Sequence, residues 1–124
     1  MRIQELNGAT LAFIGDAYYE LRVREHVLRK GITNLQKLHN ESVKFVSRSA
    51  QSRILHGLYP ILTEEECTIY KRGRNYKYKD HDEEYLTASG FEAIIGYLYL
   101  RQEQARLDEL FGLIVALIGE NNHE

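Results

Sequence analysis

The chain has 124 residues, of which 44% are hydrophobic and 27% are charged, values close to the average for a soluble globular domain. This composition excludes a disordered chain, and no apolar run approaches the roughly 18–20 residues that a membrane span needs. The single cysteine, Cys67, cannot form an internal disulfide, which is typical of proteins from a reducing cytosol. We therefore expect one cytoplasmic domain over residues 1–124.

Positive charge is concentrated in the middle of the chain, although the net charge is only −2. From Arg22 to Lys79 there are 13 Lys and Arg residues against five Asp and Glu, whereas the remainder has three basic and 13 acidic residues. This asymmetry predicts a basic surface that faces a polyanion. Ordinary solvated helix faces would have the same charge balance, so that interpretation stays open.

Apolar residues at helical spacing, with a single proline and few alternating β-branched stretches, predict an all-α fold of five to six main helices. In chain order, we expect helices at about residues 7–30, 40–56, 63–72, 84–101 and 104–118, with a single helical turn at 35–39. Gly31 is placed to end the first helix, and Thr63 with Glu66 forms a capping-box pattern. The segment from Gly73 to about residue 83 is expected to be a loop.

Two acidic residues lie inside apolar helical runs, where an unpaired charge is costly. Asp16 and Glu92 each have small neighbours, among them Gly15 and Gly96, which would let two helices approach closely. A crossing at these glycines would bring both carboxylates to one point. Two carboxylates there would suit Mg²⁺, which keeps several of its waters. Alternatively, each acid pairs with a nearby arginine or caps a helix.

Glu20 follows Asp16 by about one helical turn, so the two carboxylates share a helix face. Glu20 is therefore either a further acid of the same site or the ion-pair partner of Arg24, four residues further on.

Two segments resemble a known family. Residues 11–17, LAFIGDA, are similar to the signature helix of the ribonuclease III endonuclease domain, and residues 91–100, FEAIIGYLYL, look like that family's second carboxylate motif. The order of the motifs, their separation of about 76 residues and the helical pattern between them make the pair specific. The absence of a double-stranded-RNA-binding domain and the KRGRN segment at 71–75 resemble the Mini-ribonuclease III branch.

The resemblance implies a homodimeric, Mg²⁺-dependent endoribonuclease that cuts double-stranded RNA and leaves 5′-phosphate and 3′-hydroxyl ends. It assigns catalysis and metal binding to Asp16 and Glu92, and it makes Phe13 a candidate for insertion across the dimer interface, rather than a core residue. It also implies precursor 23S ribosomal RNA as the substrate. Because no second RNA-binding domain is expected, a ribosomal protein is a candidate for presenting the RNA, and the short apolar runs predict no membrane association. Further acids of the full-length enzymes are replaced here, since Ala9, Ala12 and Ser89 stand at their positions.

Two basic groups are candidates for RNA contact, which in A-form duplexes is made chiefly to phosphates and 2′-hydroxyls. The first group lies between the two motifs and contains Lys71, Arg72, Arg74, Lys77 and Lys79. The second group was expected to share one helix face and contains Lys44, Ser47, Arg48 and Gln51.

Two rival functions belong to other classes. A non-catalytic RNA-binding module of the same fold would explain the replaced acids at Ala12 and Ser89. A helical interaction domain without any RNA role would bind no RNA even at low salt, whereas RNA binding through phosphates depends steeply on salt.

Overall fold

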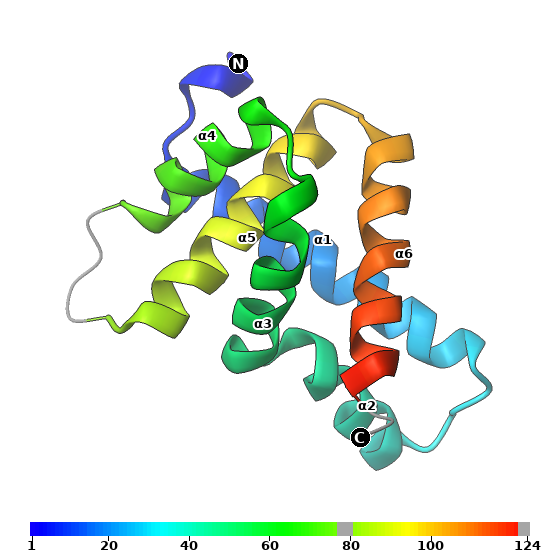
Figure 1. Ribbon diagram of the computed structural model, residues 1–124. Helices are drawn as coiled ribbons and strands as arrows, with labels where there is room; N and C mark the ends of the chain where they lie inside the picture. Colours follow the sequence, from blue (N-terminus) through cyan, green and yellow to red (C-terminus); the bar gives the residue numbers. More distant parts are fainter. Residues whose placement is uncertain (77–80, 122–124) are drawn as a thin grey trace.

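Six α-helices and two short 3₁₀ helices make up the part of the chain that the computed structural model describes, residues 1–76 and 81–121 (Figure 1). This confirms the prediction of an all-α fold with five to six main helices. The elements, in chain order, are η1 (Ile3–Glu5), α1 (Gly8–Arg29), α2 (Leu35–Val46), α3 (Arg48–Leu58), η2 (Tyr59–Ile61), α4 (Glu64–Arg74), α5 (Glu83–Leu100) and α6 (Gln104–Asn121).

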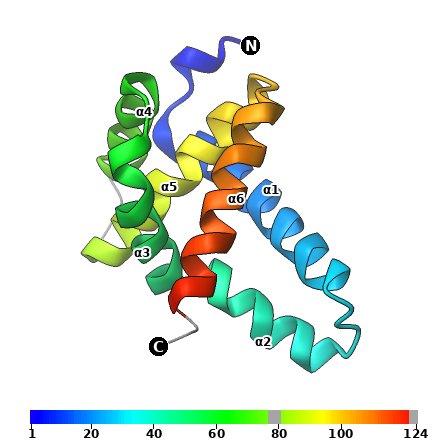
Figure 2. The same cartoon turned by 45° about the vertical axis from the view of Figure 1, so that its right-hand side comes forward.

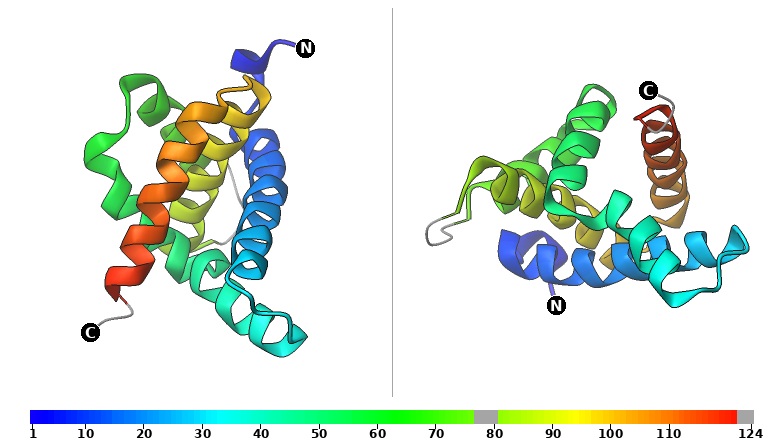
Figure 3. Two further views of the ribbon diagram at one scale, coloured as in Figure 1. Left: turned by 90° about the vertical axis from the view of Figure 1, so that its right-hand side faces the viewer. Right: turned by 90° about the horizontal axis from the view of Figure 1, so that it is seen from below.

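Helix α5 lies in the middle of the fold and contacts α1, α3, α4 and α6. Nearly every residue from Thr87 to Leu98 is buried, which is expected of a helix that is apolar on all sides. The chain turns back after α1, so that α2 returns toward α3 (Figure 2). Helix α6 packs against α3 and α5 (Figure 3). Helix α5 therefore packs against four of the other α-helices.

Helices α1 and α5 cross with their backbones in contact. A Cβ atom built on Gly15 would lie 1.8 Å from the carbonyl oxygen of Glu92, and one built on Gly96 would lie 2.0 Å from the carbonyl oxygen of Leu11. Only glycine fits at both positions, because real Cβ atoms do not approach other atoms this closely. The predicted crossing at Gly15 and Gly96 is confirmed.

The prediction of one helix over residues 40–56 is wrong, because the helix is interrupted at Ser47. Ser47 has extended backbone angles, and its hydroxyl accepts a hydrogen bond from the backbone N–H of Ala50 at 3.2 Å. It therefore caps α3 and ends α2 at once. The single turn expected at 35–39 is instead the start of α2, which Asn34 caps by accepting from Lys37 N–H at 3.1 Å.

The fourth helix extends two residues beyond the expected end, to Arg74, so the predicted loop begins later than Gly73. Its capping box is confirmed: Thr63 accepts from the Glu66 N–H, and the Glu66 carboxylate accepts from the Thr63 N–H. Among the described helices, none is long and apolar enough to cross a membrane.

Candidate active site

A cavity of about 330 Å³ lies where α1, α3 and α5 meet near the end of α2. Its lining includes Asp16, Arg48, Gln51, Tyr85, Ser89 and Glu92. The glycine crossing explains why the two acids meet there. Asp16 directly follows Gly15, and the backbone carbonyl of Glu92 is the group that touches Gly15. The main chain thus sets the separation of the carboxylates.

The two carboxylates are held close without a compensating cation. Burial raises the pKa of Glu92 to about 8, and the hydrogen bond with Asp16 and the charge of Asp16 act in the same direction. Across residues 1–76 and 81–119, neither acid forms an ion pair with a Lys or Arg. The alternative in which each acid pairs with a nearby arginine is therefore wrong within the described part of the chain.

A buried tyrosine lies behind Glu92. Tyr19 donates a hydrogen bond from its hydroxyl to the carbonyl oxygen of Phe45 at 2.9 Å, and its ring meets the Phe91 ring edge-on. Burial, followed by the nearby Glu92 charge, raises the pKa of Tyr19, which stays neutral at physiological pH. Tyr19 is therefore a buried and uncharged neighbour of Glu92.

The donor set fits a hard divalent cation. The described residues contain no group of three His, Cys, Asp or Glu side chains that could hold a metal, so Asp16 and Glu92 are the acidic donors available. Two carboxylates suit Mg²⁺, which retains several waters. A buried amide oxygen, Oε1 of Gln51, accepts no hydrogen bond from the described residues and belongs to a residue lining the same cavity.

Of the two roles predicted for Glu20, the structure shows the ion pair with Arg24. Its carboxylate lies 3.7 Å from Arg24 in an i,i+4 ion pair on α1. The Glu20 charge still contributes to the raised pKa of Glu92, as the last of several causes.

An aromatic and cationic stack borders the cavity. The Arg48 guanidinium lies 4.6 Å from the centre of the Tyr85 ring, and His81 stacks on that ring at 3.7 Å between centroids. The sequence analysis missed Tyr85. Its helical spacing could have indicated it, because Tyr85, Ser89 and Glu92 follow one another at intervals of four and three residues and so lie on one face of α5.

The residues of the second basic group, predicted to bind RNA, differ in their exposure and in their distance from the cavity. Arg48 lines the cavity, and Lys44 is exposed and pairs with Glu41 at 3.0 Å. The predicted shared helix face is wrong, because Lys44 lies on α2 whereas Arg48 and Gln51 lie on α3, and Gln51 is buried.

In the first basic group, Lys71 is exposed, whereas Arg72 and Arg74 have partners within the chain. Arg72 donates to the carbonyl oxygens of Gln4 at 2.7 Å and Leu6 at 3.2 Å, and Arg74 forms an ion pair with Glu83. Arg72 therefore ties the N-terminal segment to α4. Lys77 and Lys79 lie outside the described residues.

Phe13 is not a core residue, because 76% of its surface is exposed. Ala17 and Leu21 follow it at intervals of four residues and are exposed as well. We call Phe13, Ala17 and Leu21 the α1 stripe. It lies beside Asp16 on the same helix.

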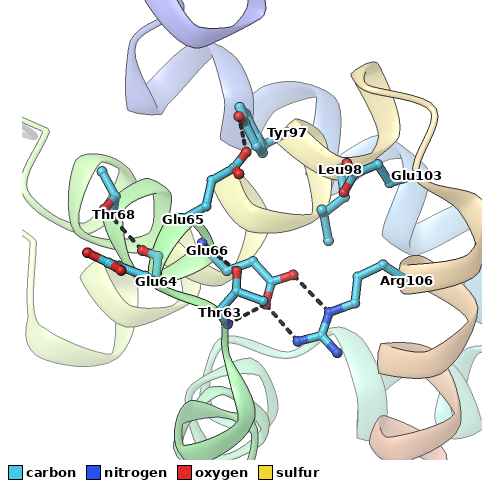
Figure 4. Close-up of a pocket in the computed structure, with 9 residues that line it drawn as sticks. All are labelled: Thr63, Glu64, Glu65, Glu66, Thr68, Tyr97, Leu98, Glu103 and Arg106. Carbon is cyan, nitrogen blue, oxygen red and sulfur yellow. Dashed lines mark hydrogen bonds and ion pairs between the residues drawn. The ribbon is translucent and has the colours of Figure 1, made fainter.

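A second and larger cleft, of about 710 Å³, lies between α4, α5 and the start of α6 (Figure 4). The Arg106 guanidinium holds the Glu66 carboxylate there, with Nε donating to Oε2 at 2.8 Å and Nη2 donating to Oε1 at 2.7 Å. Tyr97 donates a short hydrogen bond to Glu65. The charge of Glu66 is thus neutralised by Arg106, whereas Asp16 and Glu92 in the first cavity form no such ion pair among the described residues.

Comparison with known proteins decides the family. The model of the ribonuclease III domain matches residues 9–103, a span that contains both carboxylates. The chain belongs to the ribonuclease III family. It is 39% identical to a Mini-ribonuclease 3 of Enterococcus faecalis over 98% of this chain and 97% of the relative.

A second relative and a solved structure give a similar picture. The chain is 45% identical to a Mini-ribonuclease 3 of Symbiobacterium thermophilum, over 82% of each chain. The crystal structure of a Fusobacterium nucleatum protein superimposes with a TM-score of 0.85 and 29% identity, over 94% of this chain and 99% of that one. The protein is a ribonuclease III-family endoribonuclease of the Mini-ribonuclease 3 type, and this family typically depends on metal ions.

Proposed function

We propose that residues 1–124 act as one catalytic domain that hydrolyses double-stranded RNA with Mg²⁺ held by Asp16 and Glu92. The observation that carries this proposal is the carboxylate pair, which shares one cavity at a glycine crossing and forms no ion pair with a Lys or Arg among the described residues. Keeping two acids so close is costly for the metal-free protein, and a bound divalent ion removes that cost.

The residues around the cavity account for the reaction. When bound, Mg²⁺ supplies an activated water and neutralises charge that develops on the scissile phosphate. Asp16 and Glu92 would hold the ion, and Arg48 at the edge of the cavity would bind a neighbouring phosphate of the duplex. Recognition through phosphates and 2′-hydroxyls carries little sequence preference. Lys71 and Lys44 extend the positive surface available to RNA.

A homodimer supplies the second cut. One carboxylate pair cleaves one strand, so cleavage of both strands requires two sites related by a two-fold axis. The α1 stripe is an exposed apolar surface next to Asp16, and Phe13 is its most exposed aromatic side chain. We propose that the α1 stripe packs against its own copy, with Phe13 inserting into the partner.

Precursor 23S ribosomal RNA is the proposed natural substrate, matured in the cytoplasm during assembly of the large ribosomal subunit. The resemblance to Mini-ribonuclease III enzymes supports this substrate. Without a second RNA-binding domain in these residues, affinity comes from the dimer surface, and we propose that a ribosomal protein presents the RNA.

A non-catalytic RNA-binding module is the second candidate function. It is favoured by one observation, that Ser89 lines the cavity at a position where full-length family members carry an acid. This module would bind duplex RNA without cutting it.

Cleavage of a long labelled RNA duplex at low salt, with Mg²⁺ or with EDTA, tests the proposal. We expect cutting only with Mg²⁺, and a loss of about a thousandfold or more in Asp16→Asn and Glu92→Gln, since metal stabilisation supplies several kcal/mol of the barrier reduction. Glu25→Gln is the matched control, because Glu25 is an exposed acid of the same helix that pairs only with Arg29. Binding without cutting by the wild type would favour the non-catalytic module.

The natural substrate and the dimer need their own measurements. Precursor 23S RNA should be cut at defined positions, and addition of a presenting ribosomal protein should raise the rate over that of an unrelated duplex. Light scattering should report a dimer for the wild type and a monomer for Phe13→Ser. A wild-type monomer that still cuts both strands would refute the two-fold arrangement.

A further inference from the structure

One buried amide links the helix break to the catalytic carboxylate. Gln51 lies in the first turn of α3 with 4% of its surface exposed. Its Nε2 donates to the carbonyl oxygen of Val46 at 3.1 Å and to Oε2 of Glu92 at 3.4 Å. Val46 is the last residue of α2, so this single side chain connects α2, α3 and α5 at the cavity.

The hydrogen bonds fix which end of the amide faces Glu92. If the nitrogen and oxygen were exchanged, the amide oxygen would face the backbone carbonyl of Val46, and two oxygens that can only accept would lie together without a proton. The N–H groups of Gln51 therefore belong on this side. Its Oε1 then occupies the remaining side of the amide.

That oxygen is buried and has no hydrogen-bond donor among the described residues. Buried polar atoms are nearly always paired, and an exception calls for an explanation. The unpaired oxygen belongs to a side chain that touches Glu92 and lines the cavity with Asp16. Oxygen acceptors that surround a hydrated divalent ion commonly orient its ligands and its waters.

We propose that Gln51 is a positioning residue of the metal site, whose N–H groups orient Glu92 and whose Oε1 accepts a hydrogen bond from the water shell of the bound ion. This inference rests on the proposed function, because it concerns the same ion. It also explains how a site with Ala12 and Ser89 in place of further acids holds its metal.

The test compares Gln51→Met with Gln36→Met. Methionine keeps the length of the side chain and removes the amide. Gln36 is an exposed residue of α2 that bonds only to the Asn40 side chain, so the same change there leaves the cavity untouched. The first readout is Mn²⁺ binding without RNA, followed through the electron paramagnetic resonance signal of free Mn²⁺.

We expect Gln51→Met to bind Mn²⁺ about 10- to 100-fold more weakly, as is typical when a partner of a metal ligand is removed. At a fixed Mg²⁺ concentration below saturation, kcat should fall by a similar factor while KM for the duplex stays within about twofold, because Gln51 is buried away from RNA. Gln36→Met should match the wild type in both measurements.

Equal Mn²⁺ affinity in Gln51→Met and wild type would overturn the inference while leaving the proposed function intact. If the wild type binds no Mn²⁺ and does not cut, both proposals fall. Should Gln51→Met not fold, the side-chain amide resonance of Gln51 gives the answer in the wild type. It should shift on addition of Mg²⁺ and stay fixed in Asp16→Asn, and an unmoved wild-type resonance would refute the inference.

Discussion

Glu66 and Glu92 are glutamates on two helices that pack together, yet their surroundings act on the charged form in opposite ways. Glu66 is 3% exposed and accepts two hydrogen bonds from Arg106 and one from the Thr63 backbone. Glu92 receives one long hydrogen bond from Gln51 and shares its cavity with a second acid.

The pKa values follow from these partners. Burial alone would raise the pKa of Glu66, but the hydrogen bonds from Arg106 and Thr63 lower it below its ordinary value. Burial raises the pKa of Glu92 to about 8, and Asp16 adds to that effect. The ion pair of Glu66 is part of the architecture, whereas the raised pKa of Glu92 in a cavity is typical of a functional site.

Removing Arg106 should have the largest effect on stability. Arg106→Met leaves the Glu66 charge buried without its partner, which costs about 3–5 kcal/mol of the free energy of unfolding. Urea denaturation at pH 7 measures it, and Arg101→Met, which removes a more exposed arginine, is the control. Cleavage per folded molecule should stay unchanged. A loss below about 1 kcal/mol would show that Glu66 is not held by this pair.

Glu92→Gln should have the opposite effect and raise the free energy of unfolding of the metal-free protein. The pKa of Glu92 is raised on folding, so wild-type stability falls as pH rises from about 4.5 and levels off above about 8. Glutamine stays neutral throughout. We expect the variant to be more stable by roughly 2 kcal/mol at pH 9, less than the full pKa shift implies because water reaches the cavity.

Thermal denaturation of Glu92→Gln at pH 5 and pH 9, in EDTA, checks this sign. The advantage of the variant should be small at pH 5 and grow toward pH 9. Added Mg²⁺ should stabilise the wild type alone. A variant that is less stable than the wild type at pH 9 would mean that Glu92 is paired in solution.

Metal affinity should depend on pH through the same carboxyl group. Mg²⁺ binding requires Glu92 to lose its proton, so affinity should rise about tenfold per pH unit below pH 8 and level off above it. Calorimetry in buffers of different ionisation enthalpy should detect about one proton released per ion at pH 7. Constant affinity between pH 6 and pH 8 would contradict the raised pKa.

Thr63→Ala is the smallest perturbation of the paired site. It removes the hydroxyl that caps α4 while Arg106 continues to hold Glu66, so the cost should be about 1 kcal/mol. Thr68→Ala serves as the control, because Thr68 bonds only to a carbonyl within the same helix. An effect equal to that of Arg106→Met would mean that the cap, rather than the ion pair, holds the cleft.

Local signals predicted most of the fold. Two local predictions are confirmed: the capping box of Thr63 and Glu66, and the close helix crossing at Gly15 and Gly96. Each depends only on one helical turn or one contact between two helices. The break at Ser47 was not predicted. Apolar residues continue at helical spacing on both sides of it, so periodicity alone joins α2 to α3.

The site was predicted only in part for a similar reason. Asp16 and Glu92 stand out because acids are rare in apolar runs. Gln51 was predicted to contact RNA from the surface, since a glutamine in a polar helical segment looks like a surface residue until packing buries it. The pair of Glu66 and Arg106 joins residues 40 positions apart, and no local pattern indicates it.

The glycine crossing has a consequence for any mutational map of this protein. Backbone atoms fill the space that a Cβ on Gly15 or Gly96 would need, so the main chain of two helices fixes where the carboxylates stand. In a saturation screen scored by activity, we expect these glycines to tolerate as few replacements as Asp16 and Glu92. Such a screen would mark four positions as equally essential, although we propose chemistry for only two of them.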